Sequence, residues 1–118
     1  MKKLLIVGLL TLSGCSLWMA NYDSVEYSLV NKIRTQAQLG DCSKESVKSL
    51  YSTTVELKNF VQYIPRNDAT IGLANQLYII IDELHKRENP SPVYCKAKLS
   101  AIAGAAEDIQ RVVGSKPR

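Results

Sequence analysis

Four stretches of this chain repeat apolar residues every three or four positions, and this pattern limits the fold more than any other feature. The second stretch is the most regular, with steps of 3, 4, 3, 4 and 3 through Val47, Leu50, Thr54, Leu57, Val61 and Ile64. Such spacing places side chains on one face of an α-helix, and its heptad regularity is typical of helices that pack on other helices. We therefore expect a helix from about Ser43 to Ile64.

The other three stretches predict helices at about Tyr22–Leu39, Ala69–Glu88 and Val93–Val113. The side chains expected to face the core are Tyr22, Val25, Leu29, Ile33 and Ala37 in the first, Ala74, Leu77, Ile81 and Leu84 in the third, and Cys95, Leu99, Ile102, Ala106, Ile109 and Val113 in the fourth. Four amphipathic helices joined by short turns predict an all-α fold, a small up-down four-helix bundle.

Helix-breaking residues separate these stretches. Pro65 ends the second helix, and Asn-Pro-Ser-Pro at residues 89–92 interrupts the chain before the fourth. Gly40 is expected to end the first helix in a left-handed conformation, and Gly104, within the fourth, to mark the close approach of a neighbouring helix. The candidate N-caps are Asp41 or Ser43 for the second helix and Asn67 or Asp68 for the third.

The start of the chain has the order of a secretory leader: Lys2 and Lys3, a nine-residue apolar run to Leu12, and then Ser-Gly-Cys ending at Cys15. The sequence Leu-Ser-Gly-Cys resembles the lipobox of bacterial lipoproteins. The alternative is an ordinary cleaved leader, but such leaders usually end in a small-x-small site. The resemblance implies cleavage after residue 14, a thioether-linked diacylglycerol with palmitate on Cys15, and anchoring of the protein to a membrane.

The chain then divides into a signal peptide at residues 1–14, the lipidated cysteine and a short tether at 15–21, a helical domain at 22–114 and a frayed tail at 115–118. Trp18 in the tether either sits at the headgroup level or packs on the domain. Ser16 follows the lipidated position, whereas lipoproteins kept in the inner membrane of enteric bacteria typically carry Asp there. By that resemblance we expect the outer membrane, with the domain facing the periplasm or exposed on the surface.

Length and charge restrict the mature protein further. Without residues 1–14 the 118-residue chain keeps 104 residues, which suffices for one small domain. Without Lys2 and Lys3 it carries 13 basic and 11 acidic side chains, close to balance. The sequence pI of about 9.0 is therefore weak support for nucleic-acid binding, and we expect none.

Lipidation of Cys15 leaves Cys42 and Cys95 as a pair in an exported protein, which predicts a disulfide. An up-down bundle agrees, because the second and fourth helices begin at the same end. The alternatives are a reactive thiol or a metal site, although two cysteines with His85 do not have zinc-ligand spacing. We expect no metal and no cofactor.

No catalytic motif occurs in the sequence. A histidine base at His85 would be served by Asp82 or Glu88, but the neighbouring charges are typical of a solvated helix end. We therefore expect a non-enzymatic, membrane-anchored lipoprotein that binds another envelope protein. In size and anchoring it resembles the exclusion lipoproteins of phages and mobile elements and the accessory subunits of envelope assemblies.

Two kinds of surface bear on that function. Three tyrosines beside the apolar stripes are candidates for a partner surface: Tyr27, Tyr51 and Tyr63. Basic residues cluster near the cysteines and would contact anionic lipid if that end faced the membrane: Lys44, Lys48, Lys86, Arg87, Lys96 and Lys98. The alternative function is a carrier of a lipid or small hydrophobe, with an interior pocket lined by Leu57, Leu77 and Ile102.

Overall fold

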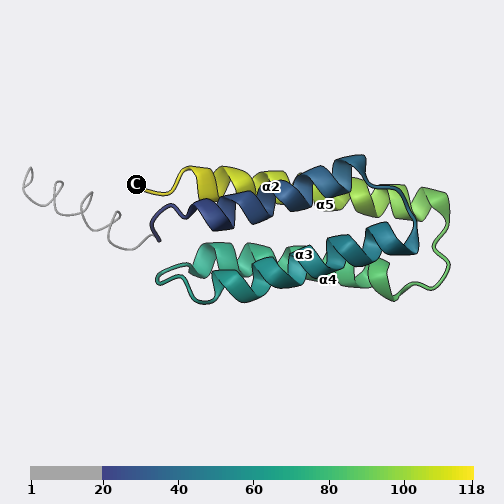
Figure 1. Cartoon of the computed structure of the whole chain (residues 1–118), viewed down its shortest axis with the longest axis horizontal. Helices are drawn as coiled ribbons and strands as arrows, with labels where there is room; N and C mark the ends of the chain where they lie inside the picture. The colour runs from purple at the N-terminus through teal and green to yellow at the C-terminus, as the bar shows by residue number, and fades with distance from the viewer. Residues whose placement is uncertain (1–19) are drawn as a thin grey trace, which may run out of the picture.

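The computed structural model describes residues 20–118, so Cys15, Ser16 and Trp18 lie outside the described residues. Four antiparallel helices make up the fold (Figure 1): α2 (Ser24–Leu39), α3 (Lys44–Val61), α4 (Asp68–Lys86) and α5 (Pro92–Gly114). Each helix packs closely on two neighbours, in the ring α2–α3–α4–α5–α2, whereas the backbones of the diagonal pairs stay farther apart. The predicted all-α, up-down four-helix bundle is confirmed. None of these helices is long and apolar enough to cross a lipid bilayer.

Three helices begin at a side chain that accepts a hydrogen bond from the first turn. Asp23 accepts from the Glu26 amide, Ser43 from the Ser46 amide and Ser91 from the Tyr94 amide. Each such cap stabilises its helix by about 1 kcal/mol. Of the two candidates for α3, Ser43 is the cap, while Asp41 accepts from the Ser43 amide at 3.0 Å.

The core follows the predicted stripes closely in α3, α4 and α5. Every predicted core residue of α4 and α5 is buried, and in α3 only Ile64, beyond the helix end, is partly exposed. The largest side chains with almost no exposed surface are Ile33, Leu50, Leu57, Leu77, Ile81, Leu84, Ile102 and Ile109. A period of three and four residues therefore identified the inward faces of three helices correctly.

The predicted stripe of α2 is wrong at its first turn. Val25 is 51% exposed, whereas Glu26 has no exposed surface. The stripe instead runs through Glu26, Val30, Ile33 and Ala37. A carboxylate can occupy this inward position because Lys116 and Asn67 bind it, as described below.

Two expectations about glycine are also wrong. Gly104 is exposed, and a Cβ added there would meet nothing within 4 Å, so no neighbouring helix approaches it closely. Gly40 has φ −72° and ψ 149°, which is not the left-handed conformation. Glycine fits there for another reason, because a Cβ would overlap the carbonyl oxygen of Gln36.

Residues 115–118 are not the frayed tail that the sequence suggested. The Tyr22 amide donates to the Pro117 carbonyl at 2.8 Å, and Lys116 is 5% exposed. Ala20, the first described residue, is 2% exposed. The last residues are therefore packed on the bundle beside the segment that enters it, and both lie at the same end (Figure 1).

Replacing the two glycines should change stability in opposite directions. Gly104→Ala should raise the free energy of unfolding by about 0.5–1 kcal/mol, because alanine favours the helix and the added methyl meets no other atom. Gly40→Ala should lower it by about 1 kcal/mol or more, because the methyl meets the Gln36 carbonyl. Chemical denaturation followed by circular dichroism measures both changes. A destabilising Gly104→Ala would show that a neighbour does pack there.

Candidate functional site

The two ends of the bundle have different chemistry. The tether end contains Ala20, the turn between α3 and α4, and the C-terminal residues, whereas the distal end contains the α2–α3 and α4–α5 loops (Figure 1). The 23 residues of α5 span about 34 Å at 1.5 Å per residue. Any site at the distal end is therefore about that far from the end at which the chain enters the bundle.

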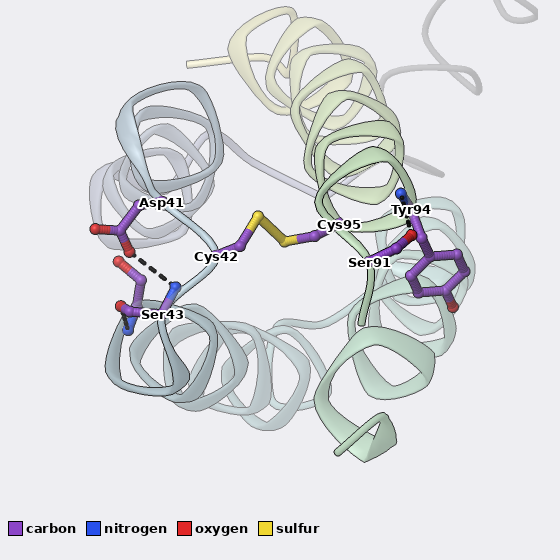
Figure 2. The surroundings of a disulfide bond; sticks show 7 residues. Asp41, Cys42, Ser43, Ser91, Tyr94 and Cys95 are labelled. Atoms are coloured by element: carbon purple, nitrogen blue, oxygen red, sulfur yellow. Dashed lines mark hydrogen bonds between the residues drawn. A yellow bond between two sulfur atoms is a disulfide. The ribbon is translucent and has the colours of Figure 1, made fainter. Parts of the chain in front are cut away.

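A disulfide between Cys42 and Cys95 joins the α2–α3 loop to the first turn of α5 at the distal end, as predicted (Figure 2). The Cα atoms are 6.1 Å apart and the two residues are 53 positions apart in sequence. Closing a loop of this length stabilises the fold by about 4 kcal/mol in the chain-entropy model. Cys95 is completely buried, and Cys42 is partly exposed. In this bonded state neither sulfur is a thiol that could attack a substrate or bind zinc.

Polar side chains order the loops on either side of the disulfide (Figure 2). Hydrogen bonds from Ser43 lower the pKa of the Asp41 carboxyl below its usual value. On the other loop, Ser91 caps α5 by accepting from the Tyr94 amide at 3.2 Å. The backbone on both sides of the bridge is therefore held by local bonds, which keeps the start of α3 and the start of α5 in register.

His85 makes a packing contact with an aromatic ring on the neighbouring helix. Its ring stacks on the Tyr51 ring, with centroids 4.2 Å apart and planes at 15°. Asp82 binds Lys86 at 2.8 Å, and Glu83 binds Lys98 on α5. The adjacent carboxylates thus diverge to different partners. Within residues 20–118, no group of three or more histidine, cysteine or acidic side chains is placed to hold a metal ion.

The three candidate tyrosines do not form one surface. Tyr63 is 86% exposed in the α3–α4 turn at the tether end. Tyr27 is half-buried on α2, with its ring 5.9 Å from that of Tyr22 and in contact with Gly114. Tyr51 lies on the face shared by α3 and α4. Spacing along the sequence placed all three tyrosines beside the apolar stripes, but it could not show whether they lie at the same place on the bundle.

Tyr51 belongs to an aromatic group that the sequence did not single out. Its hydroxyl lies 3.3 Å from that of Tyr78, and the Lys58 ammonium lies 4.2 Å above the Tyr78 ring. The hydrogen bond with Tyr51, followed by desolvation, raises the pKa of Tyr78 to about 12. Tyr78 is uncharged at neutral pH, and Lys58 and Asp82 are the charged side chains beside it.

A buried polar cluster at the tether end was also missed. The Lys116 ammonium binds the Glu26 carboxylate and donates to the Asn67 side-chain oxygen at 2.6 Å. Asn67 in turn donates to Glu26 at 2.7 Å and to the Val61 carbonyl at 3.1 Å. Asn67 stands at the N-cap position of α4, as expected, but its side chain makes no capping bond. The available signals were Glu26 beside an apolar stripe and a lysine after the last helix.

The interior pocket expected of a carrier is not found at the residues proposed for it. Leu57, Leu77 and Ile102 have no exposed surface and belong to one packed core. A surface cleft of about 230 Å³ lies instead at the distal end, between the start of α3 and the end of α4. Its lining combines the apolar Val47 and Leu84 with several basic side chains.

Comparison with known proteins gives no relative from which a function could be transferred. No family model, no curated protein and no solved structure matches this chain. A function can therefore be inferred only from the Leu-Ser-Gly-Cys stretch and from the geometry of residues 20–118.

Breaking the buried pair should be far more costly than breaking an exposed one. Lys116→Met leaves the Glu26 carboxylate buried without its cation, so we expect a loss of about 3–5 kcal/mol in the free energy of unfolding. Arg111→Met is the matched control, because Arg111 pairs with Glu107 and Asp108 on the surface and should cost less than about 1 kcal/mol.

The double variant Glu26→Gln with Lys116→Met distinguishes loss of charge balance from loss of packing. It should be more stable than Lys116→Met alone, because no unpaired charge remains in the core. Chemical denaturation measures the free energy of unfolding of the unchanged protein, the two single variants and the double variant. Equal stability of Lys116→Met and Arg111→Met would contradict the structural role of the buried pair.

Proposed function

We propose that this protein is a non-enzymatic envelope lipoprotein, anchored through Cys15, whose helical bundle binds another envelope protein. The observation that carries the proposal is the short distance between the lipobox and the fixed end of the bundle. Ala20 is buried and Tyr22 is hydrogen-bonded to Pro117, so residues 16–19 alone separate Cys15 from the packed chain. The five Cα–Cα steps from Cys15 to Ala20 reach no more than about 18 Å at 3.6 Å per residue.

This arrangement supports a defined orientation. The tether end is the end nearest to the membrane, and α5 carries the chain about 34 Å from the distal end back to it. The basic residues near the disulfide therefore belong to the end that is remote from the anchor. This geometry weighs against the idea that these residues contact the lipids of the anchoring membrane, and it favours a role in presenting a surface to a partner.

The packed core also supports binding at the surface over carriage in the interior. The side chains proposed to line a carrier pocket are completely buried within one packed core. A ligand of that kind would have to displace well-packed core groups, at a cost of several kcal/mol. Tyr51 and Tyr63, by contrast, are available on the outside without any change of the fold.

The anchor can be tested with single substitutions in an enteric host. Cys15→Ser should abolish incorporation of a palmitate analogue and move the protein out of the membrane fraction. Ser16→Asp should keep the label but shift the protein from the outer to the inner membrane, by the sorting rule that Ser16 resembles. Cys42→Ser is the control, because it removes a cysteine without touching the lipobox. Unchanged labelling of Cys15→Ser would contradict lipidation at this residue.

The partner can be tested by photocrosslinking in the intact envelope, with a photoreactive amino acid at Tyr27, Tyr51 or Tyr63. We expect a protein adduct of discrete mass from at least one position, and lipid adducts mainly from Tyr63, which is exposed at the tether end. Cys15→Ser should reduce capture of the protein, because it releases the bundle from its membrane. Capture of lipid alone at all three positions would contradict a protein-binding function.

A further inference from the structure

We propose that the distal cleft between α3 and α4 is the partner-binding site, and that it takes an extended, acidic segment of the partner protein. This inference rests on the proposed function and deepens it, since it names the surface and the chemistry of the partner. Three features of the described residues support it: the shape of the cleft, the state of its cations and the aromatic group beside it.

The cleft has an apolar floor and a basic rim. Val47 and Leu84 form the floor together with Cys42 of the disulfide. Four cations line the rim against a single acidic side chain, Glu88: Lys44, Lys48, Lys86 and Arg87. A cavity of about 230 Å³ with this lining suits one apolar side chain that is flanked by carboxylates.

The cations of the rim are available to a ligand. Lys44 and Lys48 are exposed and make no ion pair or hydrogen bond with any residue of the described chain. Arg87 lies with its guanidinium 4.0 Å above the Tyr94 ring, which fixes its plane without using its donors. Lys86 forms an ion pair with Asp82, but its side chain is 73% exposed. The rim thus carries positive charge that the protein itself does not neutralise.

A strip of rings and cations continues from the cleft along α3 and α4. His85 lines the cleft and stacks on Tyr51, Tyr51 meets Tyr78, and Lys58 covers the Tyr78 ring. From Val47 to Lys58 the strip is about 16 Å long at 1.5 Å per residue. An extended chain of about five residues spans that length, so several alternating side chains can contact the strip at once.

Charge and position together select the partner. The strip and cleft favour carboxylates next to apolar or aromatic side chains, a combination that an acidic protein segment supplies. Anionic phospholipid offers the same charge, but the cleft lies at the start of α3 and the end of α4, at the opposite end of the bundle from Ala20. Binding to anionic lipid is therefore the competing outcome of the test.

The test uses the lipidated protein in phosphatidylcholine nanodiscs. The probe is a fluorescein-labelled peptide of alternating glutamate and leucine, about eight residues long so that it covers the strip and the cleft. Fluorescence anisotropy should show binding that weakens as salt is raised, and the glutamine analogue of the peptide should bind poorly. Equal binding of both peptides would overturn the requirement for acidic side chains.

Charge reversal locates the site. The double variant Lys44→Glu with Lys48→Glu should weaken binding of the peptide by about tenfold or more, because two exposed pairs become repulsive contacts. The matched control is Lys32→Glu with Arg118→Glu, which changes net charge equally at exposed basic side chains outside the cleft and away from the disulfide. The control should change binding by less than about threefold. Equal losses in the two double variants would overturn the assignment to the cleft.

Two further results separate this inference from the proposed function. Binding of the protein to phosphatidylglycerol vesicles through Lys44 and Lys48, without binding of the peptide, would overturn the acidic segment in favour of lipid. The double variant Lys44→Glu with Lys48→Glu could also leave the yield of a protein adduct at Tyr51 in cells unchanged. That result would overturn the inference, while the protein-binding function would stand. Loss of that adduct in the double variant, and its retention in the control, would support both.

Discussion

The contact on which the tether end of this fold depends is the buried ion pair between Lys116 and Glu26. A carboxylate inside a small core is tolerated only when a cation and hydrogen-bond donors surround it, and here Asn67 supplies the second donor. The three residues come from α2, from the turn before α4 and from the chain after α5. Their meeting therefore fixes the order and the spacing of the helices at this end, and it holds the C-terminal residues against the bundle.

The disulfide has the corresponding role at the distal end. The bond between Cys42 and Cys95 ties the α2–α3 loop to the first turn of α5, so each end of the bundle has one polar or covalent cross-link. Between them the helices are joined by apolar packing of evenly spaced side chains. Packing of this kind supplies most of the stability but selects register weakly, because neighbouring heptads resemble one another. Cross-links at both ends supply the register that the apolar stripes leave open.

The sequence was sufficient for most of the architecture because its signals are local. The stripes of α3, α4 and α5 and the breaks at Pro65 and residues 89–92 follow from short-range patterns, whereas the cysteine pair followed from the cysteine count and the direction of the helices. The buried cluster was not predicted, since Lys116 and Glu26 are 90 positions apart and nothing near either residue indicates the other. The cleft was missed for the same reason: its rim combines α3 with α4, and their relative rotation depends on packing.

A nearly neutral protein can still carry a charged surface when its ion pairs lie elsewhere. Buried Glu26 and Lys116 neutralise each other at the tether end, and exposed pairs such as Lys98 with Glu83 neutralise the sides of the bundle. The side chains of Lys44 and Lys48 have no such partner among the described residues, so their positive charge beside the cleft is not neutralised by an ion pair. In the function that we propose, this charged surface lies at the end remote from the anchor, where it would speed and orient encounter with an acidic partner, and the apolar residues of the cleft would set how long that partner stays bound.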